Sequence, residues 1–228
     1  MDKLSRTLVV GDIHGCYNLL VKALKQANYQ PGLDRLIFLG DYIDRGYESA
    51  KVVKLVKELV TEGAIALMGN HEQMLLDTIR NWEEKRDYWF LNGGKQTLLS
   101  YGVELSKVRE EEAVKQAVPR EHLDFFQSLP LYLEDDEYIY CHAGIRPGVP
   151  LEKQTRDDLL WIRESFLTSP YQGKTIIFGH TPTMLIDGHG IAEVYRRENK
   201  IGIDTGAYFS GMLTVLQLSS NTYHRKSA

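Results

Sequence analysis

The chain has 228 residues, 43% of them hydrophobic and 25% charged, which suits a globular protein with a single domain over residues 1–228. Its formal net charge of −4 gives no reason to expect nucleic acid or an anionic membrane as a partner. The amino-terminal stretch lacks the apolar core of an export signal, no apolar run approaches the ~20 residues that cross a bilayer, and two cysteines are too few for a disulfide framework. We therefore expect a cytoplasmic protein.

The amino-terminal half alternates strand patterns with helical patterns. Thr7–Val10, Arg35–Leu39 and Ala64–Met68 are predicted strands, each followed by a Gly-Asp or Gly-Asn pair. Between them, apolar side chains recur at helical spacing around Leu19–Leu24 and over Glu48–Thr61. This alternation predicts parallel βαβ units in an α/β domain.

The carboxy-terminal half has a different pattern. Residues 81–127 look mostly helical, and strand patterns return after Pro130. We predict strands at Leu131–Leu133, Tyr138–Cys141, Thr175–Phe178, Ile191–Tyr195, Lys200–Ile203 and Met212–Leu218, the first two as a hairpin. We expect a second, more antiparallel sheet packed on the first with helices outside, and hence a mixed α/β chain.

Side chains that can bind metals recur where predicted strands end. They are Asp12 and His14, Asp41 and Asp44, Asn70 and His71, His142, and His180. The carboxyl ends of strands in an open α/β sheet gather around one crevice, so this set predicts a metal centre. Asp12 and His14 leave the same face of an extended segment and can chelate one ion. Asn70 and His71 are adjacent, so one can bind metal while the other faces the substrate.

Five segments resemble, in order, the motifs of the PPP-type phosphoprotein phosphatases, which belong to the calcineurin-like metallophosphoesterases. They are GDIHG at 11–15, GDYIDRG at 40–46, GNHE at 69–72, HAG at 142–144 and GHTP at 179–182. WIRE at 161–164 and LNGG at 91–94 are similar to the small bacterial and lambda-phage Ser/Thr phosphatases in particular. One motif alone fits an ordinary strand-ending turn, but coincidence does not supply five in order.

The resemblance implies a central two-sheet β-sandwich flanked by helices, with a dinuclear metal site. The implied ligands of the first ion are Asp12, His14 and Asp41, and those of the second are Asp41, Asn70, His142 and His180. Asp41 bridges the two ions. Mixed oxygen and imidazole ligands favour Mn²⁺, with Fe, Zn, Ni and Co as alternatives, over Mg²⁺ or Ca²⁺.

The resemblance also implies the catalytic roles. A hydroxide bridging the metals attacks the phosphorus in line, and His71, oriented by Asp44, protonates the leaving oxygen. The implied phosphate ligands are Arg45, Arg163 and Asn70. For Arg163 the alternative is a helix-surface cation stacked on Trp161.

These features indicate a phosphomonoester hydrolase that acts on Ser/Thr phosphoproteins or phosphopeptides. The alternative is a bis(5'-nucleosyl)-tetraphosphatase, which would use the same metals on a dinucleoside polyphosphate. Its leaving group needs less acid catalysis, so the Asp44–Arg45 pair favours monoesters. A non-catalytic metal-binding scaffold that docks phosphoproteins is a third hypothesis. The presence of His71, Asp44 and every implied ligand argues against it.

Overall fold

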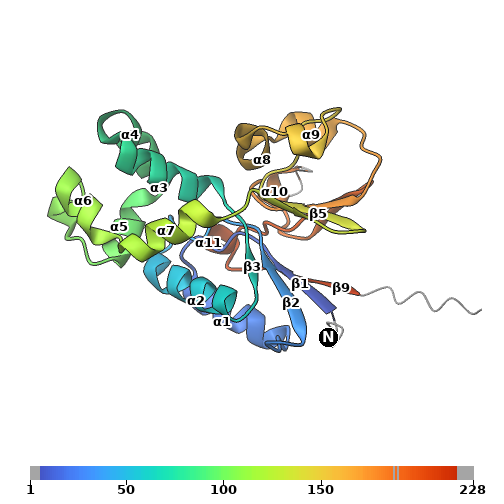
Figure 1. Cartoon of the computed structure of the whole chain (residues 1–228), viewed down its shortest axis with the longest axis horizontal. Coiled ribbons are helices and arrows are strands. Elements are labelled where there is room, and N and C mark those ends of the chain that lie inside the picture. Colours follow the sequence, from blue (N-terminus) through green and yellow to red (C-terminus); the bar gives the residue numbers. More distant parts are fainter. Residues whose placement is uncertain (1–5, 187, 189, 220–228) are drawn as a thin grey trace, which may run out of the picture.

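Two β-sheets form the centre of the chain in the computed structural model, which describes residues 6–186, 188 and 190–219 (Figure 1). Residues 1–5, part of the stretch that argues against an export signal, lie outside this range. Among the described residues, no helix has both the length and the apolar character that a membrane crossing requires.

The first sheet has the strand order β3-β2-β1-β9. Strands β1 (Arg6–Val10), β2 (Asp34–Phe38) and β3 (Ile65–Ala66) are parallel, as predicted, although β3 is shorter than expected. Strand β9 (Val215–Ser219) pairs antiparallel with β1. Expecting Met212–Leu218 in the second sheet was therefore wrong. The segment returns to the open edge of β1 because that position buries Leu216 and Leu218 between the sheets.

The second sheet has the order β4-β5-β6-β8-β7. Its inner strands β5 (Tyr138–Cys141), β6 (Thr175–Phe178) and β8 (Lys200–Gly202) are parallel, and its edge strands β4 (Tyr132–Glu134) and β7 (Tyr195–Arg197) are antiparallel. The predicted hairpin is β4–β5. The strand predicted at Ile191–Tyr195 was wrong except at its last residue, because β7 is set by its pairing with β8 across a turn at Glu198 and Asn199.

Helices cover the outer faces of both sheets (Figure 1). Those on the side of the first sheet are α1 (Tyr17–Gln26), α2 (Ser49–Thr61), α3 (Asn70–Arg80), α4 (Trp82–Leu91), α5 (Gly94–Ser100), α6 (Glu111–Ala117) and α7 (Arg120–Ser128). Those on the side of the second sheet are α8 (Arg156–Trp161), α9 (Glu164–Thr168) and the short α10 (Thr183–Ile186), while α11 (Ala207–Ser210) precedes β9. Two 3-10 turns are η1 (Leu105–Lys107) and η2 (Leu151–Lys153).

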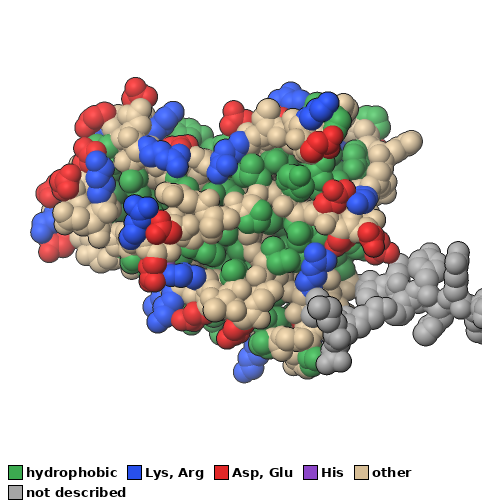
Figure 2. Space-filling model, viewed as in Figure 1, with side chains coloured by type: hydrophobic (Ala, Val, Ile, Leu, Met, Phe, Trp, Pro, Cys, Tyr) green, Lys and Arg blue, Asp and Glu red, His purple; other side chains and the backbone are tan. Residues whose placement is uncertain are grey.

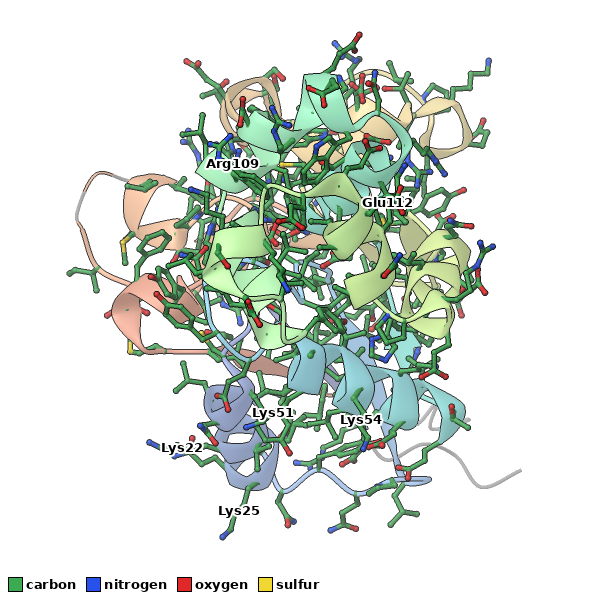
Figure 3. The ribbon with its side chains drawn as sticks, turned by 90° about the vertical axis from the view of Figure 1, so that its left-hand side faces the viewer. Lys22, Lys25, Lys51, Lys54, Arg109 and Glu112 are labelled. Atoms are coloured by element: carbon green, nitrogen blue, oxygen red, sulfur yellow. The ribbon has the colours of Figure 1, made fainter. Side chains whose placement is uncertain are left out.

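Amphipathic patterns explain how the helices lie. In α1 and α2 one face is buried, with Leu20, Leu24, Val52 and Val56 on it, whereas Lys22, Lys25, Lys51 and Lys54 are exposed on the outer side (Figure 3). On the face shown in Figure 2, basic and acidic side chains are interspersed.

The core has three parts. Val9, Ile37, Ile177 and Ile203 belong to the cluster between the two sheets, and one further cluster lies under the helices on each side. The inner strands are therefore buried on both faces, which explains their almost continuous apolar sequences. This packing fixes the carboxyl ends of β1, β2, β5 and β6, where the metal-competent side chains follow.

Candidate active site

Left-handed backbone is concentrated at the strand ends. The φ angles are 47° at His14, 53° at Asp41, 70° at Asp44, 66° at Arg45 and 64° at His180. Each such non-glycine residue costs roughly 1–2 kcal/mol. In the described part of the chain, Asn28 and Glu198 are the other non-glycine residues with positive φ. The sharp turns therefore belong mainly to the loops that aim polar side chains at one point.

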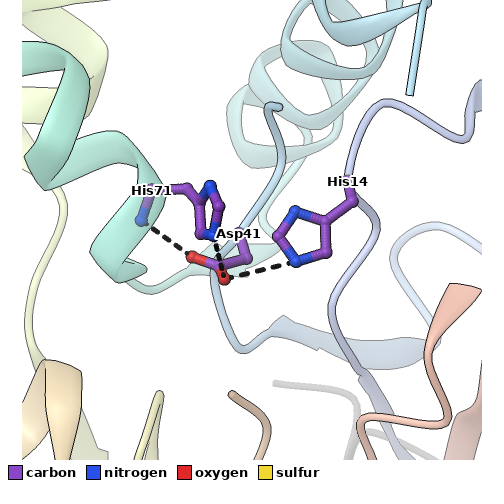
Figure 4. A group of neighbouring side chains, drawn as sticks. All are labelled: His14, Asp41 and His71. Carbon is purple, nitrogen blue, oxygen red and sulfur yellow. Dashed lines mark hydrogen bonds and ion pairs between the residues drawn. The ribbon is translucent and has the colours of Figure 1, made fainter. Parts of the chain in front are cut away.

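Asp41 lies between two groups of buried side chains. His14, Asp41 and His71 form one group (Figure 4), and Asp41, His142 and His180 form the other; within each, the candidate ligand atoms lie within 4.8 Å of one another. Asp41 Oδ2 is 3.5 Å from His14 Nε2, and Oδ1 is 3.4 Å from His142 Nε2. Asp41 thus presents one oxygen to each side, as a bridging ligand must.

Asn70 and the two later histidines meet on the second side. Asn70 Oδ1 is 2.8 Å from His142 Nε2 and 2.9 Å from His180 Nδ1. These atoms come from the start of α3 and from the loops after β5 and β6, so their sequence separation is large. The structure therefore brings Asn70, His142 and His180 together with Asp41.

The donor set fits metal cations. His142 Nδ1 donates to the carbonyl oxygen of Leu39 at 2.9 Å, and His14 Nδ1 donates to that of Ile43 at 2.9 Å. Burial lowers the pKa of both rings, so each is neutral at pH 7 and its Nε2 carries a lone pair. The lone pair of His142 Nε2 faces the side-chain oxygen of Asn70 and an oxygen of the Asp41 carboxylate. A cation between imidazole nitrogen and carboxylate oxygen resolves this repulsion, and a ligand ring held by a carbonyl is the usual arrangement.

Asp12 is buried beside this set without joining either group. Its carboxylate accepts the backbone N–H of His180 at 3.0 and 3.2 Å, so it holds the loop after β6 against the loop after β1. Burial, followed by the nearby charges of Asp204 and Asp41, raises the pKa of Asp12 well above its usual value. The carboxylates of Asp12, Asp41 and Asp204 are all buried in this region, and such a group of acids favours a bound cation.

His71 and Asp44 form a buried imidazole–carboxylate pair. His71 Nδ1 lies 2.7 Å from Asp44 Oδ2, which leaves His71 Nε2 facing Asp41 and Arg45. Asp44 is held in turn by Trp89 Nε1 at 2.9 Å and by the Thr97 hydroxyl at 2.6 Å. Burial alone would lower the pKa of His71, but Asp41 and Asp44 outweigh it and raise that pKa. The ring is thus oriented and kept basic enough to carry a proton.

Two arginines flank the site from opposite sides. A terminal nitrogen of Arg45 is 2.7 Å from His14 Nε2, and the other is 3.3 Å from His71 Nε2. Arg163 Nε donates to His180 Nε2 at 3.0 Å from the residue preceding α9. The guanidinium of Arg163 therefore points into the site. Trp161 contacts the ring of His180 edge-on, at 6.0 Å between centroids.

Glu72 fixes the backbone of the site, and sequence analysis assigned no role to this residue. Its buried carboxylate accepts the backbone N–H groups of Asp41 and Gly69 at 3.0 Å, Tyr42 at 2.8 Å and Ile43 at 3.3 Å. One side chain therefore fixes the loops after β2 and β3 relative to each other. Its place in the GNHE segment was the available signal.

Trp89, Thr97 and Asp204 are further residues that sequence reasoning missed. The first two anchor Asp44 from α4 and α5. Asp204 is buried after β8, where burial is the main factor that raises its pKa to about 6. Trp89 and Thr97 flank the LNGG segment between α4 and α5, which was the available signal for them. The sequence pattern gave no signal for Asp204.

The fold and the site define a class of protein: hydrolases whose metal-competent side chains gather at the carboxyl ends of strands from two packed sheets. The chain belongs to the calcineurin-like phosphoesterase family, whose model matches residues 5–205. Members of this family use a dinuclear divalent metal site, and the chain is a phosphoester hydrolase. The family and the fold predicted from the motifs are confirmed.

Named relatives cover nearly the whole chain. The serine/threonine-protein phosphatase 2 of Salmonella typhimurium is 34% identical, over 92% of this chain and 91% of its own. The asymmetrical bis(5'-nucleosyl)-tetraphosphatase PrpE of Anoxybacillus flavithermus is 28% identical, over 92% and 89%. A crystal structure of a putative diadenosine tetraphosphatase matches with a TM-score of 0.65 and 22% identity, covering 96% of this chain and 95% of that one, which supports the fold.

Proposed function

We propose that this protein is a Mn²⁺-dependent serine/threonine protein phosphatase that hydrolyses phosphomonoesters at its dinuclear centre. Its likeness to a Ser/Thr protein phosphatase supports the substrate class, and its mixed His, Asp and Asn donors support Mn²⁺. The observation that carries the monoester assignment is the His71–Asp44 contact of 2.7 Å. A serine or threonine alkoxide leaves poorly unless a general acid protonates it.

The proposed metal ligands are those implied by the motifs. Asp41 would be shared by two cations, Asp12 and His14 would hold one of them, and Asn70, His142 and His180 would hold the other. When bound, the two cations supply an activated water and neutralise charge on the phosphoryl oxygens. The short Asn70 and Asp41 contacts of the His142 ring support this assignment.

The chain's own groups perform the remaining steps. Arg45, Arg163 and Asn70 bind the non-bridging oxygens of the phosphate and orient the scissile bond. His71 Nε2 gives its proton to the leaving oxygen, while the hydrogen bond from His71 Nδ1 to Asp44 holds the ring in the required orientation. Every group in this scheme is buried or faces the same centre.

A phosphopeptide is the partner in this proposal, and the cytoplasm is the compartment, since Cys16 and Cys141 are free thiols. The test compares turnover of phosphoserine peptides and diadenosine tetraphosphate with Mn²⁺ present. Preference for the peptides supports the proposal, and preference for the dinucleotide assigns the chain to the tetraphosphatases instead. A protein that binds Mn²⁺ but hydrolyses neither substrate, nor p-nitrophenyl phosphate, would be a scaffold.

His71→Asn tests the general acid directly. We expect it to keep both metals and to lower kcat by roughly 10²–10⁴-fold. Unchanged turnover would remove His71 from catalysis.

A further inference from the structure

A lysine at the start of β8 is buried although its side chain is charged. Lys200 has only 2% of its surface exposed. Its ammonium donates to the carbonyl oxygen of Phe166 at 2.7 Å and also to those of Leu167 and Ser169. Removing an ammonium from water is costly unless several hydrogen bonds offset the loss. The three carbonyls supply these bonds, so the lysine is fixed to residues 166–169.

These carbonyls lie at the carboxyl-terminal end of α9. The helix has only five residues, Glu164–Thr168, too few to be stable by itself. Its last carbonyl groups lack partners within the helix and carry a partial negative charge, which a cation complements. The last turn of α9 contains no basic residue of its own. Lys200 therefore supplies, from another element, the charge that this helix end requires.

Apolar packing holds α9 on one side only. Phe166 is buried against Phe178, with 5.1 Å between the ring centroids. Toward α10 and β7 the helix borders a cavity of about 340 Å³, which Leu167 and Arg197 help to line. Close packing therefore does not prevent α9 from shifting toward this cavity. The hydrogen bonds of Lys200 do.

Further hydrogen bonds connect the same residues to one of the proposed phosphate-binding arginines. The backbone N–H groups of Phe166 and Leu167 donate to the carbonyl oxygen of Arg163 at 3.0 and 2.9 Å. The guanidinium of Arg163 in turn donates to His180 Nε2 at 3.0 Å. Lys200 thus binds the carbonyls of the two residues whose N–H groups hold the Arg163 backbone. A displacement at the lysine is therefore passed on to the arginine.

We propose that Lys200 is a positioning residue, which anchors α9 and thereby holds Arg163 where the oxygens of a phosphate bind. The inference rests on the proposed role of Arg163. A methionine at position 200 would fill a similar volume without the cost of burying a charge, but it cannot hold three carbonyl oxygens in place. Lys200 therefore acts on phosphate binding through Arg163, in addition to its contribution to stability.

The test is a double-mutant cycle on the full chain with Mn²⁺. Turnover of p-nitrophenyl phosphate and its inhibition by inorganic phosphate are measured for Lys200→Met, for Arg163→Ala and for both together. Arg163→Ala should weaken the inhibition about 10- to 100-fold, which corresponds to the loss of a hydrogen bond to a charged group. Lys200→Met should weaken it about 5-fold in the unaltered chain, and less than about 2-fold where Arg163 is already absent.

Three further variants separate positioning from a general loss of stability. Lys200→Met combined with Arg45→Ala should still weaken phosphate inhibition about 5-fold, because Arg45 lies on the loop after β2 and not on α9. Val56→Ala opens a cavity in the buried face of α2, and it should lower stability without changing the inhibition. Lys200→Gln keeps N–H donors on a shorter side chain and is measured in the same way, so that a failure of Lys200→Met to fold leaves the question decidable.

Equal losses in the presence and in the absence of Arg163 would overturn the proposal, as would unchanged phosphate inhibition in both lysine variants. If Arg163→Ala binds phosphate as well as the unaltered chain does, the proposed role of Arg163 and this inference fail together. If the chain hydrolyses diadenosine tetraphosphate and no phosphopeptide, the proposed function fails by itself. The cycle on p-nitrophenyl phosphate still decides the role of Lys200 in that case.

Discussion

The substitution Asp44→Asn isolates the charge that supports His71. The fold can accept an amide at this position. Asp44 Oδ2 accepts hydrogen bonds from Trp89 Nε1 and His71 Nδ1, so the amide oxygen of asparagine can take the position of Oδ2. The amide nitrogen then faces the Thr97 hydroxyl, which can turn to donate to Ser49 Oγ at 3.3 Å. The variant should therefore fold and lose mainly a negative charge.

The effect on His71 can be estimated. An opposite charge in hydrogen-bond contact raises an imidazole pKa by about 1–2 units, at roughly 1.4 kcal/mol per unit. Asp41 also raises the pKa of His71, but two bound cations offset its charge, so Asp44 is the partner that remains. A general acid must be protonated, so activity is lost as pH rises through its pKa. Removing the charge should move this alkaline limb toward lower pH.

The assay is a kcat profile from pH 6 to 10 with Mn²⁺, for a phosphoserine peptide and for p-nitrophenyl phosphate. Loss of acid catalysis should lower turnover of the peptide more than that of the nitrophenyl ester, because nitrophenolate leaves without protonation. Metal content measured on the same samples controls for damage to the centre. An unmoved alkaline limb, or equal losses on both substrates with full metal content, would contradict the role given to Asp44.

Other substitutions probe the rest of the site and fold. Asp41→Asn should weaken both metal ions together in a binding titration, and two tightly held ions in that variant would exclude the bridge. Lys200→Met should lower the free energy of unfolding by about 2–3 kcal/mol, because the buried ammonium donates to the carbonyls of Phe166, Leu167 and Ser169. Lys174→Met should cost less in the same denaturation assay, because the ammonium of Lys174 is more exposed where it contacts Glu134 and the carbonyl of Asp135. For Asp135, burial acts to raise the pKa, but hydrogen bonds from Tyr138 and Arg35 outweigh it and lower that pKa. The carboxylate therefore stabilises the fold above its unfolded pKa, and this stability is lost as pH falls through the folded value. The destabilisation caused by Asp135→Asn should be full at pH 7 and shrink below about pH 4; a difference independent of pH would contradict the assignment.

Strand–helix alternation predicted the first sheet well because its signals are local. Segments such as Arg35–Leu39 are apolar on both faces, and each is followed by a glycine and a polar residue. The prediction for strand β9 failed because the sequence of Met212–Leu218 does not indicate which sheet edge the strand joins. That choice depends on which edge leaves Leu216 and Leu218 buried, and the edge is more than 200 residues away in sequence.

The site was predictable where a residue type carries its own chemistry. Asp41, His142 and His180 stand out as metal-competent groups after strands, and the structure brings them together. Glu72, Trp89 and Thr97 act through their contacts with those groups, so they are found only when the loops are seen in contact. From sequence, a tryptophan in a helix is expected to lie in the apolar core. Trp89 is indeed buried, but its indole N–H also donates a hydrogen bond to Asp44.

Backbone strain and buried charge point to the same requirement. Asp41 combines a left-handed backbone with a carboxylate that faces two neutral imidazoles, and both features disfavour folding by themselves. Glu72 offsets part of this through four backbone hydrogen bonds, but it adds a further buried acid. Cations that bind only the folded chain stabilise it by mass action and neutralise these carboxylates. The unfavourable geometry at Asp41 is therefore what the proposed metal site would require, because cation binding would offset the cost of the strained backbone and the buried charge.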